Sequence, residues 1–182
     1  MEIMRLVVTG PVGAGKSTFI RAVSEIDVVD TDRKATDETS FLKEKTTVGF
    51  DFGRLQFDPE MVLHLYGTPG QARFDFMWEE LITYAHAYIL LVPAHRPAEF
   101  RKAQLIYEFM ADRVSLPMIV GVTHSDCENA WSFDNVAIAT GFTNRIQRPP
   151  FVSVNAMDPT SVTHALETLI YQYIRFAHQT AP

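Results

Sequence analysis

Cysteine is almost absent from this chain, because Cys127 is the single one among 182 residues. One cysteine excludes an internal disulfide and a zinc site built from cysteine side chains. Its place beside Asp126 leaves two interpretations open, a redox-active thiol and an ordinary small loop residue. We therefore expect a fold that is stabilised by its packed core rather than by covalent links.

An excess of basic charge is also missing. The chain carries 16 Lys and Arg residues against 22 Asp and Glu residues, which gives a formal net charge of −6. A general nucleic-acid-binding protein needs a basic face to neutralise phosphates. We expect no nucleic-acid partner.

Long apolar runs are missing as well. None reaches the roughly 18 residues needed to span a bilayer, and the longest, Ala87–Val92, is followed at once by Pro93. Gly10 opens a motif where the apolar core of a secretion signal would lie, and neither end carries a lipidation motif. These absences predict a cytoplasmic protein with no direct membrane anchor.

The apolar residues that are present suffice for one domain spanning residues 1–182, since 47% of the chain is hydrophobic. Short apolar runs alternate with segments of helical period, which predicts an α/β fold with a six-stranded, mostly parallel sheet and helices on both faces. Strands are predicted at Ile3–Thr9, Val48–Phe57, Met61–Tyr66, Ala87–Pro93, Pro117–Thr123 and Phe151–Val154, with the second and third paired as a hairpin. Helices are predicted at Lys16–Ser24, between Gly70 and Ala85, at Pro97–Arg113, from an N-terminal cap at Ser132 to near Gly141, and at Thr160–His178. Residues 27–45 are predicted as an exposed loop.

A phosphate-binding loop follows the first predicted strand. Residues 10–17 read GPVGAGKS and match G-x-x-x-x-G-K-[ST] completely, between a strand and a helix. Glycines let successive N–H groups turn toward phosphate, and the helix adds its positive amino end. Lys16 is expected to contact the outer phosphates during catalysis, and the Ser17 hydroxyl to bind Mg²⁺. The remaining predicted phosphate-binding residues of this loop are Gly10, Val12, Gly13, Ala14, Gly15 and Thr18.

Two further segments are placed to sense a γ-phosphate. Thr47, at the end of the polar loop, can set its hydroxyl on Mg²⁺ and its N–H on the phosphate. Gly70 can present its N–H to the same phosphate, and Gln71 can orient an attacking water. Taken alone, the threonine segment would indicate only β-propensity, and the segment with Gly70 would indicate only a turn. Their order after the phosphate loop favours the catalytic interpretation.

With these motifs the chain resembles the Ras-like small GTPases over nearly its whole length. More narrowly, it resembles the bacterial gliding-motility (MglA-type) small GTPases, through the Phe50-Asp51-Phe52 strand and the loop from Tyr66 to Gln71. The resemblance implies a P-loop G domain that switches between GTP and GDP with Mg²⁺ and hydrolyses GTP through Gln71, Lys16 and Thr47. It also implies a protein effector or activator, such as one of the roadblock/LC7 type.

One departure from the Ras-like pattern concerns the metal. Most Ras-like proteins have an aspartate at the position of Gly67, which holds Mg²⁺ through a water, and the MglA-type group lacks it. Asp51 is a candidate for the missing carboxylate. The alternative for Asp51 is a carboxylate on the solvent face of a strand.

Two other departures concern catalysis. Val12 stands where many Ras-like proteins have glycine, so its branched side chain crowds the γ-phosphate. The MglA-type proteins carry an arginine immediately before the position of Thr47, where this chain has Thr46. The arginines nearby in sequence, none of which matches that position, are Arg33, Arg54 and Arg73. We therefore expect slow intrinsic hydrolysis.

Two short segments indicate which base is bound. Thr123-His124-Ser125-Asp126 stands where small GTPases carry N-K-x-D, and Asn155-Ala156-Met157 stands where they carry S-A-K. The Asp126 carboxylate can accept from guanine N1–H and the 2-amino group, donors that adenine lacks. His124 can stack on the purine or lie exposed in the loop. The predicted guanine-binding residues are Thr123, His124, Asp126, Asn155 and Ala156, with the Ala156 N–H on guanine O6.

Aromatic residues gather around the second predicted helix, at Phe74, Phe76, Trp78 and Tyr84. Most are expected in the core, and the alternative is an exposed face for a partner.

Three function classes follow from the sequence. The first is a GTPase switch, and the second is a nucleotide-binding scaffold with little hydrolysis. The third is an ATP-using P-loop enzyme, which usually needs a carboxylate at a strand end. The strands ending at Gly67 and Pro93 supply none, which disfavours the third class.

Overall fold

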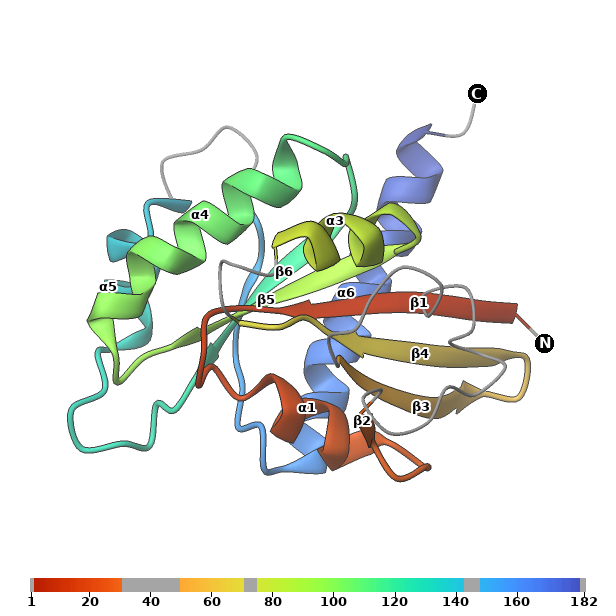
Figure 1. Ribbon diagram of the computed structural model, residues 1–182, viewed down its shortest axis with the longest axis horizontal. Helices are drawn as coiled ribbons and strands as arrows, with labels where there is room; N and C mark the ends of the chain where they lie inside the picture. The colour runs from red at the N-terminus through yellow and green to blue at the C-terminus, as the bar shows by residue number, and fades with distance from the viewer. Residues whose placement is uncertain (1, 31–49, 71–74, 143–147, 181–182) are drawn as a thin grey trace.

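The computed structural model describes residues 2–30, 50–70, 75–142 and 148–180 (Figure 1). Within these residues, seven strands form one sheet in the order β2-β3-β4-β1-β5-β6-β7. The strands are β1 (Glu2–Thr9), β2 (Val29–Asp30), β3 (Asp51–Asp58), β4 (Met61–Gly67), β5 (Ala87–Pro93), β6 (Met118–Thr123) and β7 (Phe151–Ser153). Strand β3 is antiparallel to both of its neighbours, and the other pairs are parallel.

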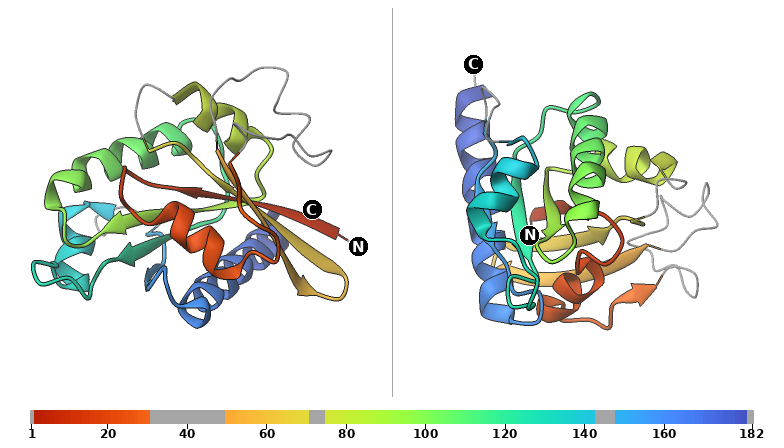
Figure 2. Two further views of the ribbon diagram at one scale, coloured as in Figure 1. Left: turned by 60° about the horizontal axis from the view of Figure 1, so that its bottom comes forward. Right: turned by 90° about the vertical axis from the view of Figure 1, so that its left-hand side faces the viewer.

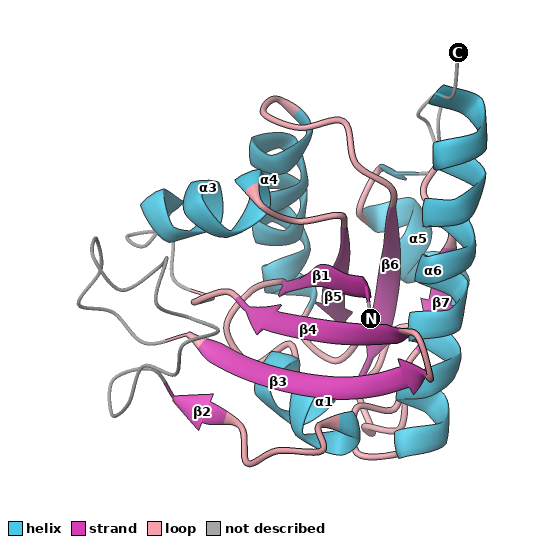
Figure 3. Cartoon of the chain, turned by 90° about the vertical axis from the view of Figure 1, so that its right-hand side faces the viewer, coloured by secondary structure: helices cyan, strands magenta, loops and turns pink. Residues whose placement is uncertain are grey.

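Helices cover both faces of this sheet (Figures 2 and 3). They are α1 (Lys16–Val23), α3 (Asp75–Thr83), α4 (Phe100–Ala111), α5 (Phe133–Ala139) and α6 (Pro159–Thr180), with a short 3-10 helix η3 (Pro97–Glu99) before α4. Helices α1 and α6 pack on one face, and α3 and α4 pack on the other. Among the described helices, none combines the length and apolar character that crossing a membrane requires.

The two-faced core follows from the alternation of side chains along each strand. In β1, Leu6 and Val8 lie in the core beneath α1 and α6, whereas Val7 lies in the core beneath α3 and α4. Strand β5 is buried at every position, because it is central and covered on both sides. This layering is the physical reason for the continuous apolar run at Ala87–Val92.

The predicted fold class is confirmed, and β3 and β4 form the predicted antiparallel hairpin. The sheet also includes β2, within the stretch predicted as a loop, because Val29 and Asp30 pair with β3. Two residues are too few to leave a periodic pattern in the sequence. At the other end of the chain, Ser132 caps α5 as predicted, since its hydroxyl accepts a hydrogen bond from the N–H of Asn135 at 3.3 Å.

The aromatic residues in and just after α3 divide between core and surface. Trp78 is buried as expected, but Phe76 and Tyr84 are each 49% exposed and line a surface hollow. The expectation that most of these side chains are core is therefore wrong for Phe76 and Tyr84. A nine-residue helix on a sheet buries one stripe, here formed by Met77, Trp78, Leu81 and Ile82. Phe74 lies outside the described residues.

Candidate functional site

The phosphate loop connects β1 to α1 at the carboxyl end of a central strand. Gly10, Gly13 and Gly15 have φ angles of 146°, 76° and 95°, in the region that favours glycine. Gly10 also lies so close to the Leu91 carbonyl that a β-carbon has no space there. Because α1 begins at Lys16, the free N–H groups of its first turn open toward the loop. This geometry is a cradle for an anion.

Lys16 lies inside this cradle and is only 8% exposed. Its ammonium group donates to the carbonyl oxygens of Gly10 at 2.8 Å and Pro11 at 2.9 Å. Burial lowers the pKa of Lys16 to about 8, and the nearby Asp51 carboxylate opposes that shift. A phosphate placed in the cradle would compensate the buried positive charge.

Asp51 lies beside the predicted metal ligand Ser17. The Ser17 hydroxyl donates to Oδ2 of Asp51 at 2.5 Å. Asp51 is also the register partner of Gly67 across β3 and β4. A β-carbon on Gly67 would lie 3.1 Å from Cβ and 3.3 Å from Oδ2 of Asp51. The Asp51 carboxylate therefore fills, from β3, the space that a side chain at Gly67 would fill from β4, and it is half-buried rather than on a solvent face.

These residues fit a magnesium ion that arrives with a nucleotide. Mg²⁺ is usually held by one or two carboxylates together with phosphate oxygens and waters. The Ser17 hydroxyl and the Asp51 carboxylate supply such a donor set at the edge of the cradle. In the described part of the chain, no group of three or more His, Cys, Asp or Glu side chains could hold a metal by itself. The ion would thus depend on the phosphate oxygens.

The segment after β4 packs directly on the phosphate loop. A β-carbon on Gly70 would lie 2.7 Å from the backbone nitrogen of Val12 and 2.8 Å from Nζ of Lys16. The indole N–H of Trp78, on α3, donates to the Pro69 carbonyl at 2.7 Å and anchors this segment. Gly70 is therefore held against Val12 and Lys16 of the phosphate loop.

The other predicted residues of the phosphate and catalytic sites differ in how far they are exposed, and two of them are not described by the structure. Ala14 is fully buried, Val12 is 48% exposed and Thr18 is exposed on α1. Thr47 and Gln71 lie outside the described residues, so their catalytic roles stay predictions from the sequence.

Thr123 links the end of β6 to the phosphate loop. Its hydroxyl donates to the Ala14 carbonyl at 2.9 Å, and the residue is 1% exposed. Thr123 therefore holds the loop after β6 against the phosphate loop.

His124 adopts a left-handed backbone, with a φ of 57°. Its ring lies against that of His95, with centroids 4.4 Å apart, and Nδ1 is 3.0 Å from the Thr123 hydroxyl. Burial lowers the pKa of His124, and the charges of His95 and Arg96 lower it further while Asp126 raises it. His124 is thus a neutral, half-buried ring at pH 7 rather than an exposed loop histidine.

The remaining predicted base-binding residues also reach this edge of the sheet. Asp126 is exposed after β6, as a carboxylate that meets a ligand must be. After β7, the Cβ of Ala156 lies 3.4 Å from the position that a β-carbon on Gly15 would take. Asn155 shapes this turn, since its Oδ1 accepts from the N–H of Met157 at 3.0 Å. Both predicted base segments therefore reach the phosphate loop near Gly15.

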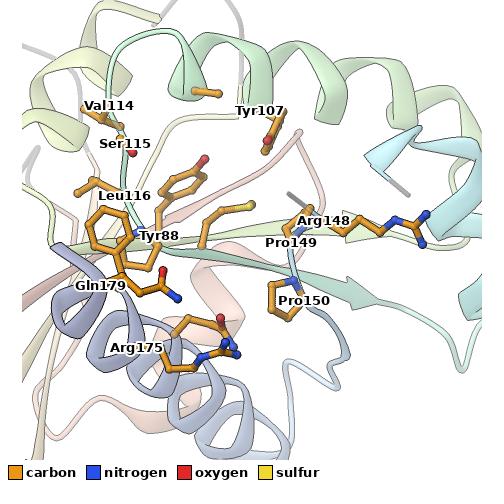
Figure 4. A pocket seen from close by; sticks show the side chains of 15 residues that line it. Tyr88, Tyr107, Val114, Ser115, Leu116, Arg148, Pro149, Pro150, Arg175 and Gln179 are labelled. Carbon is orange, nitrogen blue, oxygen red and sulfur yellow. The ribbon is translucent and has the colours of Figure 1, made fainter. Parts of the chain in front are cut away.

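A cavity of about 600 Å³ lies elsewhere, between α4 and α6 (Figure 4). Its lining includes Tyr88 and Met118, which stand at the beginnings of β5 and β6. The phosphate loop lies at the opposite ends of these parallel strands, so the cavity is separate from the site described above.

Comparison with known proteins agrees with this geometry. A solved structure similar to this chain is that of the small GTPase Arl6 (BBS3) from Trypanosoma brucei with a bound nucleotide analogue, GppNp. Its TM-score is 0.73 at 17% identity, covering 96% of this chain and 99% of that one. Identity this low shows the fold alone. No curated protein matched the chain.

The fold and the site define a P-loop nucleotide-binding protein with the architecture of a small GTPase. A family model described as "Conserved hypothetical ATP binding protein" matches residues 27–174. The chain belongs to this family. The matched residues begin after the phosphate loop, so the loop at residues 10–17 is an independent indication of nucleotide binding.

Proposed function

We propose that this protein is a guanine-nucleotide switch that binds GTP and GDP with Mg²⁺ and hydrolyses GTP slowly. The observation that carries the proposal is the meeting of the phosphate loop with Thr123, His124 and Ala156, the residues that the sequence predicts to bind guanine. Lys16 and Gly70 lie together at the phosphate loop, and both would gain contacts with a γ-phosphate that a diphosphate lacks. Such a differential is what drives a two-state switch.

The residues divide the chemistry among them. Ser17 and Asp51 would hold Mg²⁺, which supplies positive charge to the phosphate oxygens. Lys16 would neutralise the outer phosphates, and Gln71 would orient the attacking water. Thr47 would contact the γ-phosphate and so couple the order of its loop to the bound nucleotide.

Slow intrinsic hydrolysis is supported by two features. Val12 is 48% exposed at the mouth of the phosphate loop, and Thr46 takes the place of an arginine expected from the MglA-type resemblance. We expect a single-turnover rate with GTP and Mg²⁺ well below about one per second, measured by quenched-flow release of phosphate. A rate at or above that value would contradict the proposal of a slow enzyme.

Regulation by a partner protein, of the roadblock/LC7 type or another, belongs to the same proposal. Phe76 on α3 and Tyr84, just after its end, form an exposed aromatic face, and Trp78 of the same helix anchors the segment at Pro69. A partner bound there would contact the helix that supports Gly70. Turnover with and without a partner separates this switch from a scaffold that hydrolyses little.

Base choice is the sharpest test of the proposal. We expect nucleotide-free protein to bind GDP at least about tenfold more tightly than ADP, because only guanine presents donors to the Asp126 carboxylate. Asp126→Ala should remove that preference, measured by titration of labelled GDP and ADP with Mg²⁺. Glu128→Ala, two residues further along the exposed loop, is the matched control and should keep it.

The second candidate function is an ATP-using protein, and the description of its family favours it. Equal or tighter binding of ADP by the parent protein would favour that function and overturn the guanine proposal. Retention of the GDP preference in Asp126→Ala would show that another residue selects the base.

A further inference from the structure

Arg96 is a cation at the phosphate loop that no nucleotide-binding motif of the sequence includes. It follows β5, whose carboxyl end lies beside that of β1 because the two strands are parallel neighbours. Its Nη1 donates to the Val12 carbonyl at 3.2 Å, across 84 residues of sequence. A β-carbon on Gly13 would lie 2.6 Å from the same nitrogen, so the guanidinium fills the space beside that glycine.

Glu99 holds this arginine in place. The Glu99 side chain is 7% exposed, and its Oε1 lies 3.6 Å from Nη2 of Arg96 and 3.0 Å from Nζ of Lys102. Its second oxygen, Oε2, is buried without a hydrogen-bond partner within the described residues. A buried carboxylate is costly unless it is paired with cations, so Glu99 fixes the Arg96 guanidinium instead of leaving it free on the surface.

The contacts of Arg96 leave donors for a ligand. A guanidinium has five N–H donors in a planar fork, and it binds phosphate oxygens with charge-assisted hydrogen bonds. One donor is used on Val12, and the ion pair with Glu99 engages the other terminal nitrogen. The side chain is 43% exposed, so part of the fork faces solvent at the rim of the cradle.

The loop after β6 does not supply a positive charge of this kind at the phosphate loop. His124 occupies the position where the resemblance places a lysine, and its lowered pKa keeps the ring neutral at pH 7. Among the described side chains, Lys16 and Arg96 are the cations that hydrogen bond to the carbonyl groups of the phosphate loop.

We propose that Arg96 is a phosphate-binding residue of the nucleotide site, positioned by Glu99, and that it slows nucleotide release by adding a second fixed cation at the rim of the phosphate loop. This inference rests on the proposed nucleotide-binding function. It does not depend on the base, because the contact is to phosphate.

The test is the dissociation rate of fluorescent GDP or ADP, whichever the parent protein binds more tightly, with Mg²⁺ present. We expect Arg96→Ala to release the nucleotide at least about tenfold faster, the effect of losing one charge-assisted contact. Arg96→Lys, which keeps the charge but not the fork, should be intermediate. Arg101→Ala is the matched control, since Arg101 contacts Gln104 on the exposed side of α4, and its rate should equal that of the parent.

Ionic strength separates a phosphate contact from mere support of the loop. Salt screens a cation and a phosphate at the protein surface, so the parent rate should rise with salt more steeply than the Arg96→Ala rate. An Arg96→Ala rate within about twofold of the parent, or an unchanged salt dependence, would overturn the proposal. If the parent bound neither nucleotide, the proposed function itself would fail, and the role of Arg96 with it.

Discussion

Replacing Lys16 by methionine is expected to weaken binding of GDP and GTP by at least about a hundredfold, since losing a buried charge-assisted contact costs roughly 3 kcal/mol. Lys16 is the cation inside the cradle, and its ammonium group is already oriented by the Gly10 and Pro11 carbonyls. Methionine keeps the apolar stem but offers no charge. Equilibrium titration with fluorescent nucleotide and Mg²⁺ measures the effect.

The fold is expected to survive this substitution. Burial lowers the pKa of Lys16 from 10.5 to about 8, so the charged group opposes folding. The unfolded chain then binds more protons between these two values, and the parent gains stability as the pH rises through that range. The stability of Lys16→Met should not rise with pH in this way, and its melting temperature at pH 7 should stay within about 5 °C of that of the parent.

Arg21→Ala is the matched control for Lys16→Met, because Arg21 lies on the exposed face of the same helix. It should bind nucleotide as the parent does. Parental affinity in a folded Lys16→Met variant would show that the Lys16 ammonium group does not contact phosphate, and the proposed role of Lys16 would then be wrong.

Replacing Asp51 by asparagine is expected to raise the Mg²⁺ concentration needed to retain nucleotide by about tenfold to a hundredfold, the usual effect of losing a residue that supports a metal. Asparagine can still accept the hydrogen bond from Ser17, so the change removes charge with little change in shape. The measurement is GDP release while Mg²⁺ is titrated with a chelator. Asp58→Asn, at the far end of β3, is the control and should leave the Mg²⁺ requirement unchanged.

A swap of two residues tests whether position in space matters more than the strand that supplies the carboxylate. The variant Asp51→Gly loses the group, and adding Gly67→Asp returns it from β4 to nearly the same place. In the double variant, the Asp51 side chain no longer crowds the new β-carbon at position 67, which it would otherwise approach to 3.1 Å. The end of the Ile20 side chain is then the neighbour that must move aside. We expect the double variant to recover most of the parental Mg²⁺ requirement.

Two outcomes would contradict this account of Asp51. An unchanged Mg²⁺ requirement in Asp51→Asn would show that the carboxylate does not serve the metal. A folded double variant as defective as Asp51→Gly would show that β3 supplies something that β4 cannot.

The sequence by itself determined the features that depend on neighbours in the chain. The phosphate loop could be predicted because a strand, three glycines, Lys16 and Ser17 follow one another within 16 residues. The buried β5 could be predicted because burial on both faces demands a continuous apolar run. The cap at Ser132 also depends only on local spacing.

Only the tertiary structure decided the features that depend on strand register and order. Asp51 reaches Ser17 across 34 residues, Arg96 reaches Val12 across 84, and Thr123 reaches Ala14 across 109. Each contact exists because the parallel order β4-β1-β5-β6 brings distant loops to one edge of the sheet, with β3 paired to β4 in a register that sets Asp51 opposite Gly67. Hydrophobic alternation shows which face of a strand is buried, but it does not show which strand lies beside it. The contacts of Arg96 with Val12 and of Thr123 with Ala14 could therefore not be found from the sequence. For Asp51 the resemblance gave a candidate role at the metal but left the solvent-facing alternative open, and the register of β3 on β4 decided between them.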